Sequence, residues 1–382
     1  MWTRFARVSA AALRNRKSLA ASSAAAASLT LSEVAQCDAP KPGNSLNKFG
    51  LGDIPSEAYK SHFQGAYNKA ADKSVANVAR RNDSISADHA EPEGEREIRL
   101  SVARFLMSRL GYSDDELAFI GEDVLRMQGV GSPFSAVTLR AGETVLDLGS
   151  GFGIDSFLAA EKVGPDGRTI GVDLSAEEVV RAEKRARERG FNKCSFVQGD
   201  VENLPLEGSS VDAVISNGAF CLCPSKPKAF REVYRVLRPG GRIAVSCTVL
   251  QKPLPALQDK RWPPCMEVFM QKADIKELLQ SIGYTAVRVD DSNSRMDVWD
   301  LGDPELERVA LSMTGKEKDS ESFGCSHAKK AAARRAKQAV EGYLSKDREV
   351  GIHWGNPEFA HIKEYDMDEF CQRVVIYAEK HG

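Results

Sequence analysis

The sequence predicts an α/β fold built on a mostly parallel sheet, and three observations support this class. Short β-rich runs alternate with helical patterns between Thr144 and Val289, as expected for parallel strands joined by helices. A glycine turn follows the first of these runs and opens a helix, the arrangement found at the ligand-binding edge of open α/β sheets. The chain has 382 residues, of which 42% are hydrophobic, so it is long enough to bury a proper core.

The expected elements follow in order along the chain. Apolar spacing predicts a helix over 97–110, and Ser113 with Glu116 forms a capping box for a second helix. Another capping box, Ser175 with Glu178, starts a later helix, and residues 239–241 (PGG) are expected to turn the chain into the fifth strand. Strands are expected at 144–148, 169–172, 195–198, 211–216, 242–248, 286–289 and, near the end of the chain, 373–378, and helices up to 162 and over 176–189, 226–237 and 273–282.

The first forty residues have the composition of a targeting segment. Five basic residues precede the first acidic residue, Glu33, and the stretch from Ser18 to Ser32 consists almost entirely of Ala, Ser and Leu. This Arg-rich, Ser-rich and acid-poor pattern is typical of an organelle transit peptide. We expect a mitochondrial address, with the plastid as the alternative. The expected organisation is a transit peptide over 1–40, a largely disordered linker over 41–96, one α/β domain over 97–300, and a charged helical tail over 301–382.

Charge and cysteine usage exclude several classes of partner. The formal net charge is -2 with acidic and basic residues interspersed, which leaves no basic footprint for a nucleic acid. No stretch is apolar enough over a sufficient length to span a membrane as a helix. The eight cysteines show no repeated CxxC spacing and no paired histidines nearby, so we expect neither a metal site nor a disulfide framework. A small molecule is the expected partner, and the oligomeric state is not indicated.

The strongest motif is the glycine turn itself. Residues 147–153 read Asp-Leu-Gly-Ser-Gly-Phe-Gly, so the candidate ligand-binding residues are Asp147, Gly149, Gly151 and Gly153. Ile154 stands where the dinucleotide fingerprint requires its third glycine, which disfavours a nicotinamide or flavin cofactor. An acidic residue at the start of the turn suits a ligand with a positively charged end better than a pyrophosphate.

Further polar residues end the following strands. Asp173, followed by Leu174, lies at the distance from the glycines expected of a ribose-binding acid. Asp200, followed by Val201, comes after the third strand and has the chemistry to accept a hydrogen bond from an adenine amine. Asn217 follows the fourth strand. The carboxyl ends of parallel strands meet at one edge of a sheet, so these residues are predicted to line a nucleoside site.

Several motifs together resemble the S-adenosylmethionine-dependent methyltransferases of the Rossmann-like class, and among them the arsenite methyltransferase family. The resemblance covers about residues 110–290 and is carried by 112–117 (YSDDEL), the turn at 129–133, 142–151 (GETVLDLGSG), 163–167 (VGPDG), 202–205 (ENLP) and 231–241 (REVYRVLRPGG). It implies S-adenosylmethionine bound through Asp147 and the glycine loop, ribose on Asp173, adenine beside Asp200, and methyl transfer to a small acceptor by direct displacement.

The resemblance also implies three thiolates around the arsenic atom, and this chain departs from that pattern. Val130 and Gly218 stand at the first two thiol positions, and Cys265 at the third. Cys221 and Cys223 follow the vacant second position, where they serve either as substitute ligands or as small buried residues; free cysteine is among the most buried residue types. Because As(III) prefers soft thiolate ligands, arsenite specificity is in question.

Two alternatives therefore stay open. One is C- or O-methylation of a small organic or quinone-like acceptor, in an apolar pocket lined by Phe220, Leu222, Trp262 and Met266. No histidine falls within the core motifs to act as a general base, so no catalytic residue is assigned. The other is a non-catalytic, S-adenosylmethionine-binding organelle assembly factor with 300–382 as its interaction surface. The intact glycine turn argues against that second alternative.

Overall fold

The computed structural model describes residues 57, 59–61, 64–65, 95–127, 129–257, 260, 262–292, 294–296, 361–362 and 364–382. All of them belong to one compact unit. The predicted transit peptide, most of the predicted linker and residues 301–360 of the predicted tail lie outside the described residues.

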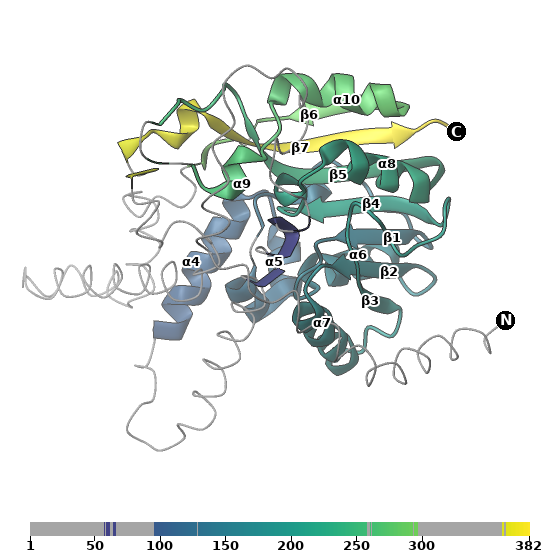
Figure 1. Cartoon of the computed structure of the whole chain (residues 1–382). Coiled ribbons are helices and arrows are strands. Elements are labelled where there is room, and N and C mark those ends of the chain that lie inside the picture. Colours follow the sequence, from purple (N-terminus) through teal and green to yellow (C-terminus); the bar gives the residue numbers. More distant parts are fainter. Residues whose placement is uncertain are drawn as a thin grey trace, which may run out of the picture. The chain divides into compact units, whose positions relative to one another are not determined.

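A seven-stranded sheet organises this unit, with the strand order β3-β2-β1-β4-β5-β7-β6 (Figure 1). The strands are β1 (Thr144–Leu148), β2 (Arg168–Asp173), β3 (Cys194–Gln198), β4 (Val211–Asn217), β5 (Leu237–Leu250), β6 (Tyr284–Asp290) and β7 (Cys371–Lys380). The first five strands run parallel, whereas β7 pairs antiparallel with both β5 and β6. The predicted α/β class with a mostly parallel, Rossmann-like sheet of seven strands is therefore confirmed.

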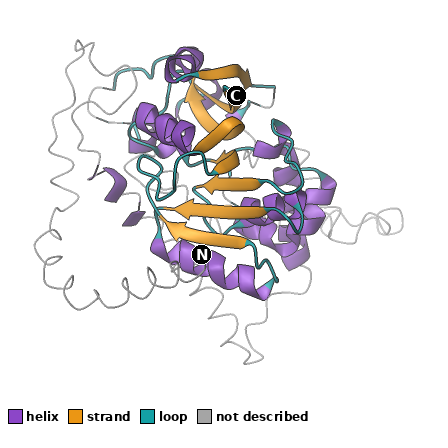
Figure 2. Ribbon diagram, turned by 90° about the vertical axis from the view of Figure 1, so that its right-hand side faces the viewer, coloured by secondary structure: helices purple, strands orange, loops and turns teal. Residues whose placement is uncertain are grey.

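Helices cover both faces of the sheet (Figure 2). They are α4 (Glu95–Arg109), α5 (Asp114–Ile120), α6 (Ile154–Val163), α7 (Ala176–Glu188), α8 (Lys226–Val236), α9 (Pro264–Glu267) and α10 (Ile275–Ile282), with short 3-10 turns η4 (Gly121–Arg126), η5 (Pro133–Ser135), η6 (Phe220–Leu222), η7 (Lys272–Asp274) and η11 (Met367–Glu369). Successive strand residues point to opposite faces. Val145 of β1 accordingly packs in one core cluster with residues of α6, while Leu146 packs in another with residues of α8 and α10. The central strands β1 and β4 are buried along almost their whole length because both faces of the sheet are covered there.

β5 differs most from its prediction. The strand begins at Leu237, five residues before the expected start, and includes the glycines that were expected to form a turn. Leu237 is fully buried and pairs with Val211, after which the pairing between β4 and β5 shifts register. Gly240 absorbs this irregularity with φ of +76°. The glycines thus redirect the chain as predicted, but as an irregularity inside β5 and not as a turn that precedes the strand.

The end of the chain lies in the interior of the sheet. β7 separates β5 from β6, so both edges of this late strand are paired (Figure 1). Ile362 and Cys371 pack against Trp262 and Met266, which come from the segment after β5. Within the described part of the chain, none of the helices has the length and apolar character needed to cross a membrane.

Candidate functional site

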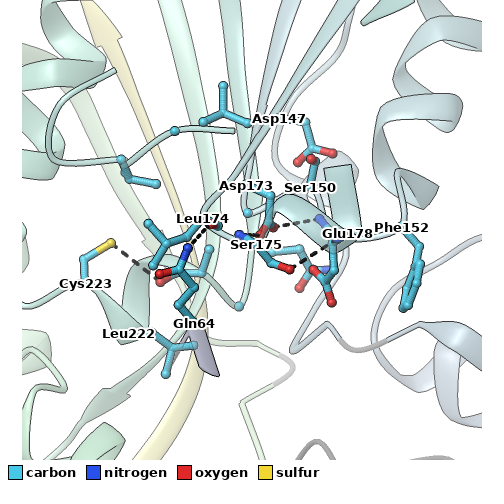
Figure 3. A pocket seen from close by; sticks show the side chains of 18 of the residues that line it. Gln64, Asp147, Ser150, Phe152, Asp173, Leu174, Ser175, Glu178, Leu222 and Cys223 are labelled. Carbon is cyan, nitrogen blue, oxygen red and sulfur yellow. Dashed lines mark hydrogen bonds between the residues drawn. The ribbon is translucent and has the colours of Figure 1, made fainter. Parts of the chain in front are cut away.

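A pocket opens at the carboxyl ends of β1 to β4, where most of the predicted ligand-binding residues meet (Figure 3). Its wall includes Asp147, Gly149, Gly151, Asp173, Leu174, Asp200, Val201 and Asn217. Of the predicted cofactor-binding residues, Gly153 is the one that does not line this pocket. A β-carbon at Gly153 would lie 2.7 Å from Cζ of Phe196, so this glycine lets α6 start close to β3.

The glycine turn is held tightly against its neighbours. The backbone N–H groups of Gly149 and Ser150 donate to the carbonyl of Val172, at 2.8 and 3.2 Å. Gly149 has φ of +69°, and a β-carbon there would lie 2.2 Å from Cβ of Ala219. A residue with a side chain would therefore be both strained and obstructed at this position. Among the described residues, the buried hydroxyl of Ser150 has no hydrogen-bond partner, which leaves one polar group of the turn for a ligand.

Two buried carboxyl groups lie side by side at the base of the turn. Asp147 is 2% exposed and accepts a hydrogen bond from Ser156 Oγ at 2.6 Å. Asp155 accepts from the hydroxyl of Tyr112 at 2.8 Å and from Asn217 Nδ2 at 3.1 Å. Burial, together with the charge of Asp155, raises the pKa of Asp147 to about 8, and burial raises the pKa of Asp155 to about 6.

Within the described chain neither of these two carboxyl groups forms a salt bridge, so their negative charge is not balanced by a protein cation. A buried carboxylate without a counter-charge is costly, and a ligand cation beside it lowers that cost. This end of the pocket is therefore suited to a positively charged group.

Asp173 and Glu178 form a second acidic pair, on the β2 side of the pocket (Figure 3). Asp173 accepts from the backbone N–H of Gly151 at 2.9 Å and of Ser175 at 2.8 Å. Ser175 caps α7 by accepting from the N–H of Glu178, but the carboxyl group of Glu178 does not complete the predicted capping box. It is 4% exposed at the pocket, and burial and the nearby Asp173 raise its pKa to about 8. By contrast, the box formed by Ser113 and Glu116 is complete.

Asn217 uses its side chain to position the segment that precedes β1. Its Oδ1 accepts from the N–H groups of Val130 and Gly131, at 2.8 and 3.2 Å, and its Nδ2 donates to Tyr112 and Asp155. Arg373 of β7 fixes the same turn from the other side, because its Nη1 donates to the carbonyl of Val130 at 2.9 Å. Asn217 lies at the end of β4, as predicted. Its side chain, however, bonds to the protein and holds the wall of the pocket.

The three cysteines singled out from the sequence all lie near the buried ring of Tyr59, but only one of them lines the pocket. Cys223 lines the pocket, whereas Cys221 and Cys265 do not. Burial raises the pKa of all three thiols, that of Cys223 to about 12. Lys226 is 3% exposed and donates to the carbonyls of Cys221 and Cys223, at 3.1 and 2.6 Å. Among the described residues, no group of three or more His, Cys, Asp or Glu side chains is arranged to hold a metal ion.

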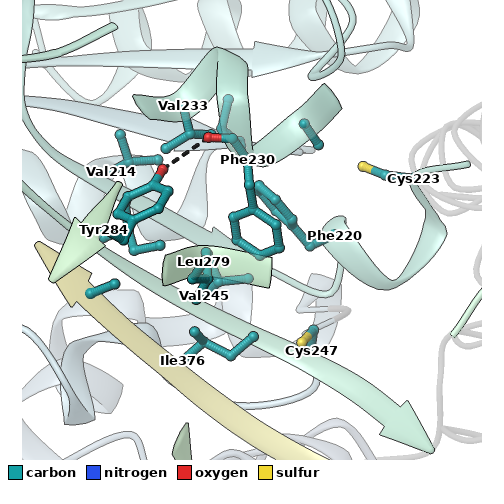
Figure 4. Close-up of a cluster of buried hydrophobic side chains, with 14 of the residues drawn as sticks. Val214, Phe220, Cys223, Phe230, Val233, Val245, Cys247, Leu279, Tyr284 and Ile376 are labelled. Carbon is teal, nitrogen blue, oxygen red and sulfur yellow. Dashed lines mark hydrogen bonds between the residues drawn. The ribbon is translucent and has the colours of Figure 1, made fainter. Parts of the chain in front are cut away.

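The predicted apolar lining is mostly in the core. Phe220 is buried and stacks near Phe230, with ring centroids 4.6 Å apart (Figure 4). Trp262 and Met266 are buried in the cluster that covers the end of β5. Leu222 alone of these four lines the pocket. The other three were assigned wrongly because an aromatic or sulfur side chain near a predicted site is as well suited to packing as to ligand contact.

Sequence reasoning missed the contribution of the predicted linker. Tyr59, Lys60 and Gln64 line the pocket, and Gln64 Nε2 donates to the carbonyl of Leu174 at 2.9 Å. Lys60 Nζ lies 2.6 Å from Oδ2 of Asp200. Residues 41–96 carry no motif that predicts these contacts, because the residues that Lys60 and Gln64 contact lie more than a hundred positions further along the chain.

Comparison with known proteins finds similarity to several methyltransferases. Residues 139–284 match the family model described as a methyltransferase domain. An arsenite methyltransferase from Halobacterium salinarum is 38% identical over 214 residues, 54% of this chain and 54% of that protein. The human arsenite methyltransferase is 30% identical over 177 residues, 43% of this chain and 46% of that protein. The chloroplastic 2-phytyl-1,4-beta-naphthoquinone methyltransferase of Arabidopsis thaliana is 36% identical over 109 residues, 28% of this chain and 42% of that protein.

The chain thus spans about half the length of the curated relatives that it matches. Among solved structures, the arsenic (III) S-adenosylmethionine methyltransferase of Chlamydomonas reinhardtii is similar with a TM-score of 0.40 and 21% identity, over 73% of each chain.

Proposed function

We propose that the protein binds S-adenosylmethionine in this pocket and transfers its methyl group to a small acceptor. The proposal starts from the match of residues 139–284 to a methyltransferase domain. One observation carries the proposal: Asp147 and Asp155 are buried at the pocket without a protein counter-charge. S-adenosylmethionine has a positively charged amino group and a sulfonium, and either offers the missing charge.

The residues of the pocket have the chemistry to hold such a ligand. Asp147 would face its positively charged end, and Ser150 offers a free buried hydroxyl. Asp173 and Glu178 would accept hydrogen bonds from the ribose hydroxyls, and Asp200 from the adenine amine. When bound, the sulfonium supplies an electrophilic methyl group. The contribution of the protein is to orient the two reactants in line and to exclude water from them.

The thiols near the pocket bear directly on the identity of the methyl acceptor. A trivalent arsenic centre requires thiolates, yet Val130 and Gly218 carry no sulfur. Burial holds the thiols of Cys221, Cys223 and Cys265 in the protonated form at neutral pH. These observations support a small organic acceptor. The similarity to arsenite methyltransferases supports arsenite as the second candidate.

One experiment separates the two acceptors. The chain from Pro40 onward is incubated with methyl-labelled S-adenosylmethionine, arsenite and a thiol reductant, and the variants Cys265→Ser and Cys221→Ser/Cys223→Ser are assayed beside it. Cys194→Ser serves as the matched control, because this partly exposed thiol lies outside the pocket. Methylated arsenic that Cys265→Ser or Cys221→Ser/Cys223→Ser loses and the control retains would identify arsenite as the acceptor.

No arsenic product, with cofactor binding that Asp147→Ala abolishes, would direct the search to organic acceptors such as quinone precursors. If wild-type protein does not bind S-adenosylmethionine, the proposed function is wrong.

We further propose that the protein is imported into mitochondria. The support is the composition of residues 1–40, which is rich in Arg and Ser and contains its first acidic residue at Glu33. A fluorescent protein fused after residue 40 should co-localise with a mitochondrial marker, and deletion of residues 2–32 should leave it in the cytosol. Plastid localisation in a photosynthetic host would support the alternative address.

A further inference from the structure

We propose that Lys60 is a positioning residue that fastens two segments to the pocket: the segment that carries Tyr59 and Gln64, and, through Glu202, the loop that carries Cys223. The inference deepens the proposed function and rests on it only for the identity of the ligand. Lys60 lies outside the region that matches the methyltransferase family model, so that model does not account for it.

The contact of Lys60 joins one cation to two carboxylates. Its Nζ lies 2.6 Å from Asp200 Oδ2 and 2.9 Å from Glu202 Oε2, and its side chain is 13% exposed. Burial opposes the charged form of Lys60, but the hydrogen bonds to Asp200 and Glu202 outweigh this effect and raise its pKa. The ammonium group therefore stays charged. Charge-assisted hydrogen bonds of this kind are stronger than neutral ones.

A second contact attaches the same segment next to β2. Gln64 Nε2 donates to the carbonyl of Leu174, directly after Asp173 (Figure 3). Tyr59 is 4% exposed and lines the pocket beside Lys60. The segment is thus anchored at the ends of both β2 and β3, which are the strands that present the predicted ribose and adenine contacts.

Glu202 connects Lys60 to the loop after β4, because its carboxylate contacts both of them. Its Oε1 accepts from the backbone N–H of Ser225 at 2.6 Å, while its Oε2 accepts from Lys60. Ser225 is the N-cap of α8, and its own side chain makes no capping hydrogen bond. The carboxylate of Glu202 instead accepts from the backbone N–H of Ser225 and places a negative charge at the helix start, where it is favourable. The next residue, Lys226, donates to the carbonyls of Cys221 and Cys223.

Removal of the Lys60 ammonium would leave Asp200 and Glu202 as two neighbouring carboxylates without their shared cation. Their mutual repulsion and desolvation would then favour movement of both toward solvent. The expected consequence is a coordinated release: the segment with Tyr59 leaves the pocket, and the N-terminus of α8 loses its cap, so the loop that carries Cys223 loosens. A residue that only filled space would not couple these two events.

The test uses the full chain from Pro40 and three variants. Lys60→Met keeps the aliphatic stem without the charge, Lys60→Arg keeps the charge, and Lys228→Met removes an exposed lysine of α8 as the matched control. Without added ligand, chymotryptic cleavage after Tyr59 and alkylation of Cys223 by N-ethylmaleimide are followed by mass spectrometry. We expect both rates to rise about tenfold in Lys60→Met, the change produced by about 1.4 kcal/mol of lost interaction. Lys60→Arg should restore most of the protection, and the control should match wild type.

Glu202→Gln separates the two halves of the proposal. Glutamine can still accept from Ser225 but places an amide nitrogen or a neutral oxygen against Lys60. It should expose Tyr59 less than Lys60→Met does, because Lys60 keeps its contact with Asp200, and the double variant should be no more exposed than Lys60→Met alone. S-adenosylmethionine should also bind about tenfold more weakly to Lys60→Met than to wild type.

Unchanged cleavage in Lys60→Met would overturn the proposal, and so would faster cleavage at Tyr59 with alkylation of Cys223 at the wild-type rate. Failure of the wild-type protein to bind S-adenosylmethionine would contradict the proposed function instead, because the two rates measured without ligand still decide the role of Lys60.

Discussion

Gly149 offers a direct test of how the pocket is built. Replacement by alanine adds one methyl group at a position with φ of +69°, where its carbon would lie 2.2 Å from Cβ of Ala219. A left-handed backbone conformation costs a non-glycine residue about 1–2 kcal/mol. The contact is also far shorter than the roughly 3.5–4.0 Å at which carbon atoms pack, and overpacking of this kind costs about 1–3 kcal/mol. Gly149→Ala should therefore lower the free energy of unfolding by about 2–5 kcal/mol.

Two further variants separate strain from obstruction. Gly190→Ala places alanine at φ of +76° with no atom within 4 Å of the new β-carbon, so it should show only the backbone cost. Ala219→Gly in the Gly149→Ala background removes the opposing methyl group and should restore about 1–3 kcal/mol. Urea denaturation measures the free energy of unfolding, and calorimetric titration measures the affinity of the pocket for S-adenosylmethionine. Equal losses in Gly149→Ala and Gly190→Ala, or no recovery in the double variant, would refute the steric argument.

Three other predictions concern the buried acids and their partners. Burial raises the pKa of Asp147 to about 8 and that of Asp155 to about 6 in the folded protein. Between the ordinary carboxyl pKa and these values, the ligand-free folded protein therefore binds more protons than the unfolded chain. The free energy of unfolding should fall as pH rises from about 5 to 8.5, and urea denaturation at these two pH values measures it. Over the same pH range the affinity for S-adenosylmethionine should rise, because a cation binds ionised carboxylates better than protonated ones. In calorimetric titrations, Asp147→Asn should weaken the pH dependence of this affinity. A wild-type pH profile in that variant would exclude Asp147 as the group responsible. Tyr112→Phe removes the hydroxyl that contacts both Asp155 and Asn217, and should destabilise the protein by about 1–3 kcal/mol. Tyr377→Phe removes a hydroxyl that donates to the partly exposed Glu379 and should cost less; a similar loss in both variants would argue against a special role for the buried network.

Local patterns were sufficient for the sheet and for the residues at the ends of its strands. Each strand except the fifth lies within two residues of its expected bounds, because alternation of short apolar runs, helical spacing and turn residues is written locally. Asp147, Asp173 and Asp200 meet in one pocket for the same reason. Once the strands are parallel and consecutive, their carboxyl ends must lie along one edge of the sheet.

Identical local patterns nevertheless had different outcomes where long-range contacts differ. Ser113 with Glu116 and Ser175 with Glu178 have the same spacing, and only the first forms a complete capping box. Glu116 also lies 2.8 Å from Lys162, which places an opposite charge beside it at the helix start. Glu178 instead lies against the pocket, where burial favours its protonated form. The capping pattern in the sequence does not indicate whether the glutamate side chain lies beside an opposite charge or against the pocket.

The sequence by itself therefore determined the class of fold, the glycine turn and the acidic residues that follow the strands. Only the tertiary structure decided which thiols reach the pocket, that Phe220 and Trp262 belong to the core, and that Lys60 closes the wall beside Asp200. The physical reason is the range of the interactions involved. Strand, helix and turn preferences act between near neighbours, whereas burial and ion pairing bring together residues that are far apart in the chain, such as Lys60 and Asp200, which are 140 positions apart.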